Sequence, residues 1–160
     1  VHTLDVGDEA VVTELEMALV PVDPVMPVHA ECARGLPDSV VTFVPDSAEF
    51  VEERVAMREI LGLVAELERS GCRGGITVIG TTSSARTAAE RHRTATDRAN
   101  AVARILAREL DVDRSEITTV AAGYDERYCA RDRDANGVLV PELAAACRQV
   151  IISIGRPEDR

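Results

Sequence analysis

Residues 80–106, GTTSSARTAAERHRTATDRANAVARIL, join a short loop to a stretch that carries one arginine after another. Thr82 and Ser83 lie in the loop, and Arg98 lies in the helical stretch. A guanidinium group binds a carboxylate through two parallel hydrogen bonds, whereas a serine hydroxyl offers a hydrogen bond without charge. The chemistry that this unit can support is the recognition of a polar ligand. It requires a fold that brings position 83 close to position 98.

Patterns that indicate catalysis are weak. His2, His29 and His92 are scattered along the chain, and no nucleophile–base spacing stands out. Ser83 and Ser84 follow a strand, but the nucleophile-elbow pattern Gly-x-Ser-x-Gly is absent. We therefore expect a binding domain that is not an enzyme and needs no cofactor.

The run Asp132-Arg133-Asp134-Ala135-Asn136-Gly137 copies the opening of a calcium loop, with oxygen ligands at alternate positions and a glycine at the turn. The glutamate that closes such a loop is missing, since Leu143 stands at the twelfth position. Asp, Asn and Gly also form ordinary turns. We favour the turn, with Asp132, Asp134 and Asn136 as a weak calcium candidate and no metal site expected.

Four cysteines lie far apart, at positions 32, 72, 129 and 147, and none belongs to a CxxC pair. Zinc sites usually draw their ligands from close pairs, so zinc is a poor explanation. We favour two disulfides, which implies an oxidising compartment outside the cytosol. Three connectivities remain open; one of them pairs Cys129 with Cys147 and Cys32 with Cys72. The alternative is four buried thiols.

Charge and hydropathy exclude two classes of partner. The net charge of −10 argues against nucleic acid, because phosphate binding needs a basic surface. No apolar run approaches the roughly 20 residues that span a bilayer, so we expect no membrane insertion by this part of the protein.

Four short apolar segments predict strands, and longer amphipathic segments predict helices between them. The strands are expected at 39–44, 76–80, 117–124 and 148–154. Helices are expected at 51–69, capped by Asp46 or Ser47, and from Thr87, where Thr-x-x-Glu forms a capping box. A short helix should open at Pro141. The order predicts an α/β sandwich.

The second helix has an apolar face on which residues recur at three- and four-residue steps. It includes Ala88, His92, Ala95, Ala99, Val102, Leu106 and Leu110. We therefore expect His92 to be a partly buried, hydrogen-bonded residue and not a ligand.

The chain divides into three parts. Residues 1–36 hold an apolar stretch at 9–20, read as a strand or a short helix, and the proline-rich PVDPVMP. We interpret them as an N-terminal extension or connector. Residues 37–155 form the predicted domain, and residues 156–160 form a polar tail.

Several positions match a known family in order and spacing. They are Phe43, Ser47 and Ala48 in the first strand and turn; Gly80 to Ser83 after the second strand; Arg98, Ala99 and Val102 in the following helix; Gly123 to Glu126 after the third strand; and Cys147 to Val150 at the last strand. Residues 39–154 thus resemble the OmpA-like domain. The resemblance implies a two-layer α/β sandwich with helices packed on a mixed four-stranded sheet.

The resemblance also implies a ligand. In OmpA-like domains an aspartate and the helix arginine hold the diaminopimelate side chain of the peptidoglycan stem peptide. Arg98 matches the arginine, and Ser83 stands at the position of the aspartate. Since serine brings no charge to an ammonium group, we expect weakened binding, with Thr82 and Arg148 assisting.

Two functions follow from the resemblance. The first is non-covalent peptidoglycan binding in an extracytoplasmic location at the cell envelope. The second is an envelope scaffold or protein-interaction domain that kept the fold and lost the ligand.

Overall fold

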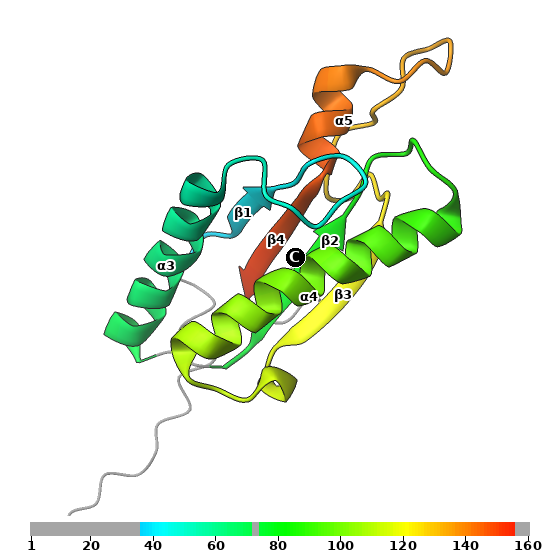
Figure 1. Ribbon diagram of the computed structural model, residues 1–160. Coiled ribbons are helices and arrows are strands. Elements are labelled where there is room, and N and C mark those ends of the chain that lie inside the picture. Colours follow the sequence, from blue (N-terminus) through cyan, green and yellow to red (C-terminus); the bar gives the residue numbers. More distant parts are fainter. Residues whose placement is uncertain (1–35, 72–73, 156–160) are drawn as a thin grey trace, which may run out of the picture.

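The computed structural model describes residues 36–71 and 74–155. Along the chain the elements are β1 (Ser39–Thr42), α3 (Glu53–Ser70), β2 (Ile76–Thr81), α4 (Ala88–Leu110), the short 3-10 helix η1 (Arg114–Glu116), β3 (Thr118–Gly123), α5 (Pro141–Cys147) and β4 (Gln149–Ile154). All four predicted strands and the three predicted helices are present in this order (Figure 1). The predictions for 9–20, for the proline-rich stretch and for the tail at 156–160 fall outside the described residues.

The four strands form one mixed sheet with the order β1-β4-β2-β3. β4 pairs antiparallel with both β1 and β2, whereas β2 and β3 run parallel. The ends of β1 and β2 therefore meet the start of β4 at one end of the sheet. The register between β2 and β3 shifts after Gly80, so that Thr81 lies opposite Gly123. Such irregularities commonly redirect the chain beside a functional site.

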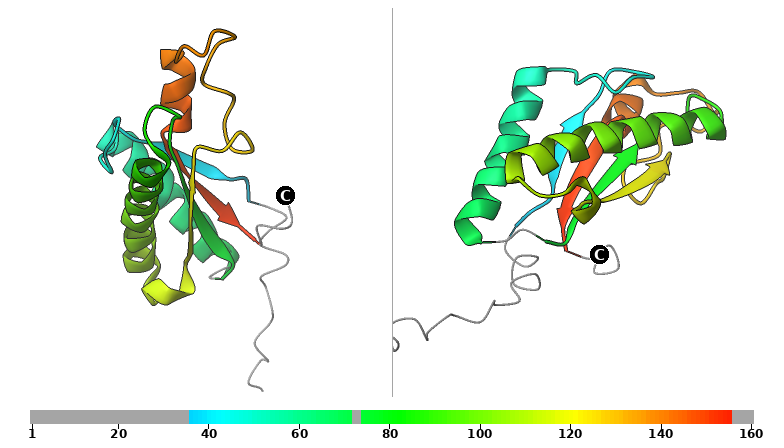
Figure 2. Two further views of the ribbon diagram at one scale, coloured as in Figure 1. Left: turned by 90° about the vertical axis from the view of Figure 1, so that its right-hand side faces the viewer. Right: turned by 60° about the horizontal axis from the view of Figure 1, so that its bottom comes forward.

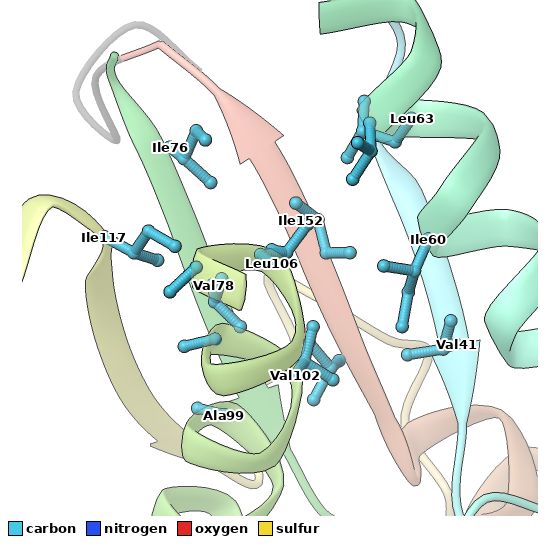
Figure 3. Packing of buried hydrophobic residues seen from close by; sticks show 14 of the residues in the cluster. Val41, Ile60, Leu63, Ile76, Val78, Ala99, Val102, Leu106, Ile117 and Ile152 are labelled. Atoms are coloured by element: carbon cyan, nitrogen blue, oxygen red, sulfur yellow. The ribbon is translucent and has the colours of Figure 1, made fainter. Parts of the chain in front are cut away.

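α3 and α4 pack against the same face of the sheet, and α5 lies at the end where β4 begins (Figures 1 and 2). The core between these two layers is aliphatic (Figure 3); its members include Val41, Ile60, Leu63, Val78, Val102, Leu106 and Ile152. Full burial of each of these side chains contributes roughly 1.5–3 kcal/mol. None of the helices in residues 36–71 and 74–155 is long and apolar enough to cross a membrane.

The sequence signals are correct at three helix ends, at Thr87, Gly71 and Pro141, and wrong at one. Thr87 caps α4: its hydroxyl accepts from the Glu90 N–H, and the Glu90 carboxylate accepts from the Thr87 N–H, which confirms the capping box. α3 ends at Gly71, whose φ of 75° few other residues adopt at low cost. The predicted cap of α3 by Asp46 or Ser47 is wrong, because the Phe43–Phe50 bridge closes a loop first and the helix starts only after Glu52.

The prediction for His92 is also wrong, since its side chain is exposed. Burial along α4 begins only at Ala95. The first turns of the helix extend toward the end of the sheet (Figure 1), where Ala88 and His92 have the correct helical phase but line an open surface hollow beside Ala121 to Tyr124 instead of packing in the core. The periodicity identifies the face of a helix; it does not show where its neighbour ends.

Candidate ligand-binding site

The four residues predicted to bind a ligand line one pocket at the end of the sheet where β2 ends and β4 begins. Thr82 and Ser83 come from the loop after β2, Arg98 from α4 and Arg148 from the junction of α5 and β4. Position 83 and position 98 thus border a common cavity, as the sequence analysis required. Four further residues line the same pocket, namely Asp46, Arg86, Arg91 and Thr94.

Arg98 is the floor of this pocket, and only 1% of its surface is exposed. Its guanidinium donates three hydrogen bonds to main-chain carbonyls: Nε to Ser47 at 2.8 Å, Nη1 to Thr81 at 2.8 Å and Nη2 to Val44 at 2.9 Å. The group also lies over the Phe43 ring, 5.3 Å from its centroid. Arg98 therefore ties the β1–α3 loop to the end of β2, in addition to any contact with a ligand.

The Arg98 guanidinium has five N–H groups, and three of them donate the hydrogen bonds described above. The other two, one on Nη1 and one on Nη2, are not used in these bonds. Burial lowers the pKa of Arg98 to about 10, with the nearby positive charge of Arg148 as the second cause and Asp46 opposing both. The group stays protonated at neutral pH. It can thus offer a charged pair of donors to a carboxylate.

Thr82 and Arg148 each carry a buried polar atom that lacks a hydrogen-bond partner. These atoms are the Thr82 hydroxyl oxygen and the Arg148 Nε. Thr82 is only 4% exposed. Its main-chain N–H donates to the Gly123 carbonyl at 2.8 Å, but its hydroxyl oxygen has no partner among the described residues. Buried polar atoms are nearly always paired, and an unpaired one needs an explanation. A ligand that binds in this pocket would supply the missing partners.

Ser83 is 8% exposed, and its hydroxyl accepts one long hydrogen bond, from the Ala85 N–H at 3.5 Å. A hydrogen bond between an uncharged N–H and a hydroxyl oxygen is weak at this donor–acceptor distance. The hydroxyl is therefore available to a ligand, but it has no charge with which to hold an ammonium group.

The rim of the pocket holds an ion pair that sequence reasoning missed. Arg86 donates from Nη2 and Nε to the Asp46 carboxylate at 2.6 and 3.1 Å, and both side chains are about half exposed. The hydrogen bond from Arg86 keeps the pKa of the Asp46 carboxyl below its usual value, and the charges of Arg98 and Arg148 act in the same direction. No short motif joins positions 46 and 86, so no local pattern predicts this pair.

The free volume between these side chains is about 10 Å³. That volume is roughly the least that admits one water molecule. A larger ligand needs the rim to open. An exposed ion pair contributes at most about 1 kcal/mol, so separating Arg86 from Asp46 costs little.

Asp132 fixes the loop that carries Ser83. This carboxylate is fully buried and accepts from the Ser84 N–H at 2.7 Å and the Ser84 hydroxyl at 2.6 Å. Asp134, the second calcium candidate, accepts from the main-chain N–H groups of Asn136 and Val138, as in a turn. Among the described residues no cluster of three His, Cys, Asp or Glu side chains could hold a metal ion. Both carboxylate oxygens of Asp132 and the Oδ1 of Asp134 are engaged in hydrogen bonds within the protein.

A disulfide joins Cys129 to Cys147 across 18 positions of sequence, with the Cα atoms 5.4 Å apart. It links the loop between β3 and α5 to Cys147, which directly precedes Arg148. This is one of the predicted pairs. Cys32 and Cys72 lie outside the described residues.

Comparison with known families decides the identity of the fold. A family model described as the OmpA family matches residues 42–137, more than half of the chain. The chain belongs to the OmpA family. Among curated protein sequences none matches it. The expected OmpA-like two-layer α/β sandwich and its mixed four-stranded sheet are confirmed.

Solved structures of OmpA-like domains share the fold. The peptidoglycan-associated lipoprotein from Burkholderia pseudomallei is 19% identical, with a TM-score of 0.54 over 72% of this chain and 88% of that chain. The OmpA-like domain of FopA1 from Francisella tularensis is 21% identical (TM-score 0.51; 72% and 69%). The cell wall anchor of the T6SS from Pseudomonas aeruginosa is 23% identical (TM-score 0.51; 74% and 82%).

Proposed function

We propose that this OmpA-family domain binds peptidoglycan non-covalently, through the carboxylate end of a stem peptide that contains diaminopimelate. The observation that carries the proposal is the pocket around Arg98, where the Thr82 hydroxyl and the Arg148 Nε are buried without partners. Both Arg98 and Arg148 bring positive charge to it. A carboxylate is the group that such donors bind best.

Each residue of the pocket has a distinct role in this proposal. The two remaining N–H groups of Arg98 and the Nε–H of Arg148 donate to the carboxylate oxygens. The hydroxyls of Ser83 and Thr82 contact the nitrogen of the same amino acid. Because a charge-assisted hydrogen bond contributes roughly 1.5–3 kcal/mol against about 1 for a neutral one, Ser83 in place of an acid weakens binding on the order of tenfold.

The proposed location is extracytoplasmic, at the cell envelope. The structural relatives support it, since one of them is a peptidoglycan-associated lipoprotein and another a cell wall anchor. The Cys129–Cys147 disulfide supports it independently, because disulfides persist in oxidising compartments. The proposed role is that of a binding domain without catalysis, with the cell wall and envelope proteins as its partners.

Co-sedimentation with purified sacculi tests the proposal. The wild-type domain is expected to pellet with sacculi at low salt and less at high salt, because its contacts are electrostatic. Arg148→Ala should lower the affinity about tenfold, the loss of one charge-assisted hydrogen bond. Arg148 suits this test because its Nε has no partner among residues 36–71 and 74–155, so the fold loses little.

Arg108→Ala is the matched control, since Arg108 is exposed at the far end of α4 and its side chain pairs with the neighbouring Glu109. It should bind as the wild type does. No sedimentation of the wild type at low salt, or equal losses in both variants, would reject the proposal.

One observation favours the alternative of an envelope scaffold that has lost this ligand. The free volume of the pocket is enough for only about one water molecule. In contrast, Val40, Val51 and Val55 form an exposed apolar patch at the edge strand β1. Under this alternative, substitutions in the pocket leave the behaviour of the protein with sacculi unchanged. Val55→Asp should instead weaken the binding of envelope proteins to this apolar patch.

A further inference from the structure

The pocket around Arg98 carries an excess of positive charge. Four guanidinium groups line it, from Arg86, Arg91, Arg98 and Arg148, against the single carboxylate of Asp46. This local balance is opposite to that of the whole chain, whose net charge is −10. An ammonium group that enters here meets like charges at close range, which disfavour it.

The one carboxylate of the pocket is already occupied. Asp46 accepts two hydrogen bonds from Arg86, and its charge also faces Arg98 and Arg148. If an ammonium group bound Asp46, Arg86 could not re-form its pair with that carboxylate after the ligand had entered. The position where an acid is expected holds Ser83, which is neutral.

The polar atoms that face the expected position of the ligand nitrogen are hydroxyl oxygens. The Thr82 hydroxyl is buried without a partner, and the Ser83 hydroxyl has only one long hydrogen bond. A hydroxyl oxygen can accept a hydrogen bond from an uncharged amide N–H, which loses far less hydration on burial than an ammonium group does. It cannot offset the loss of hydration of a full positive charge. An amide nitrogen next to a carboxylate therefore fits these atoms better than an amine.

We propose that the pocket selects stem peptides in which the side-chain nitrogen of the diamino acid is acylated, as it is in a cross-link, over stems in which this nitrogen is a free ammonium. The carboxylate of the same residue binds Arg98 and Arg148, and the amide N–H donates to Ser83 or Thr82. This inference rests on the proposed function and adds a preference for cross-linked wall.

Two synthetic peptides test the preference by calorimetry. Both are the tripeptide L-Ala-γ-D-Glu-diaminopimelate; in one the side-chain amine is free and in the other it is acetylated. The wild-type domain is expected to bind the acetylated peptide several-fold more tightly. Ser83→Asp should shift the ratio of the two affinities toward the free amine by roughly tenfold, because a charged acceptor is restored. Ser83→Asn introduces a side chain that has nearly the shape of aspartate but is neutral. It should leave the ratio close to that of the wild type.

The outcomes separate this inference from the proposed function. If the wild type binds both peptides through Arg148 but prefers the free amine, the proposed function stands and the preference is rejected. If that preference disappears in Asp46→Asn, Asp46 is the acid for the ammonium group, which also overturns the inference. If neither peptide binds and Arg148→Ala leaves co-sedimentation with sacculi unchanged, both proposals fail. Thermal unfolding of each variant verifies that it is folded.

Discussion

Arg98→Ala is expected to reduce the free energy of unfolding by about 3–5 kcal/mol, a large part of the 5–15 kcal/mol typical of a domain. The change removes the donor for the carbonyls of Ser47, Thr81 and Val44. An unsatisfied buried polar group costs about 1–3 kcal/mol, and water that enters the cavity recovers part of this cost. Urea denaturation of both proteins measures the difference.

Arg98→Lys separates the charge from the geometry. Lysine keeps the positive charge but has no planar fork, so it cannot reach the two carbonyls of the β1–α3 loop and the Thr81 carbonyl of β2 at once. We expect it to be nearly as destabilising as alanine. Arg108→Ala on the same helix should change stability by less than about 0.5 kcal/mol, as exposed substitutions do. A loss below about 1 kcal/mol in Arg98→Ala would contradict the structural role of this guanidinium.

Substitution of Arg98 is a poor test of ligand binding, because this side chain also anchors the β1–α3 loop. A variant that loses both the donor for a ligand and the anchor of the β1–α3 loop does not show which loss abolished binding. Substitutions at Arg148 and Ser83 do not have this ambiguity, because their pocket-facing atoms make one weak hydrogen bond or none within the protein.

Gly80→Ala is expected to destabilise the domain by about 4 kcal/mol or more, or to prevent folding. A Cβ atom at position 80 would lie 2.1 Å from the Ala95 carbonyl oxygen and 2.9 Å from the carbonyl carbon. These are main-chain atoms of α4, so the whole helix would have to lift off the sheet. Circular dichroism and thermal unfolding of the purified variant measure the effect.

Two further substitutions make this test specific. Ala95→Gly should not rescue Gly80→Ala, since the clash is with the main chain and not with the alanine side chain. Gly62→Ala, in the exposed middle of α3, meets no atom within 4 Å and should stabilise the protein by roughly 0.5–1 kcal/mol. A Gly80→Ala domain that unfolds at the wild-type temperature would show that α4 does not pack this closely on β2.

Local signals in the sequence were sufficient for most of the fold. The capping box at Thr87 and the glycine at position 71 mark helix ends through contacts within a few residues, and both are present. Short β-branched runs gave the four strands within a few residues of their bounds. Such signals do not depend on the rest of the molecule, and this is why they could be interpreted from the sequence.

The failures involve distant parts of the chain. His92 is exposed because the first turns of α4 border an open hollow at the end of β3 and do not pack in the core, and helical spacing contains no information about where that packing begins. Asp46 faces Arg86, forty positions away, instead of capping α3. The resemblance placed Arg98 in the pocket, but two of its three hydrogen bonds to carbonyls depend on the path of the β1–α3 loop.

The central claim is that the pocket formed by Thr82, Ser83, Arg98 and Arg148 receives the carboxylate end of a stem peptide. Nuclear magnetic resonance of the isotope-labelled domain, titrated separately with the free-amine and the acetylated tripeptide, tests this claim most directly. We predict that the largest shifts occur at the main-chain amides of Thr82, Ser83 and Arg148 and at the Nε–H of Arg148. Shifts confined to the apolar patch at Val40, Val51 and Val55, or no shifts at saturating peptide, would contradict it.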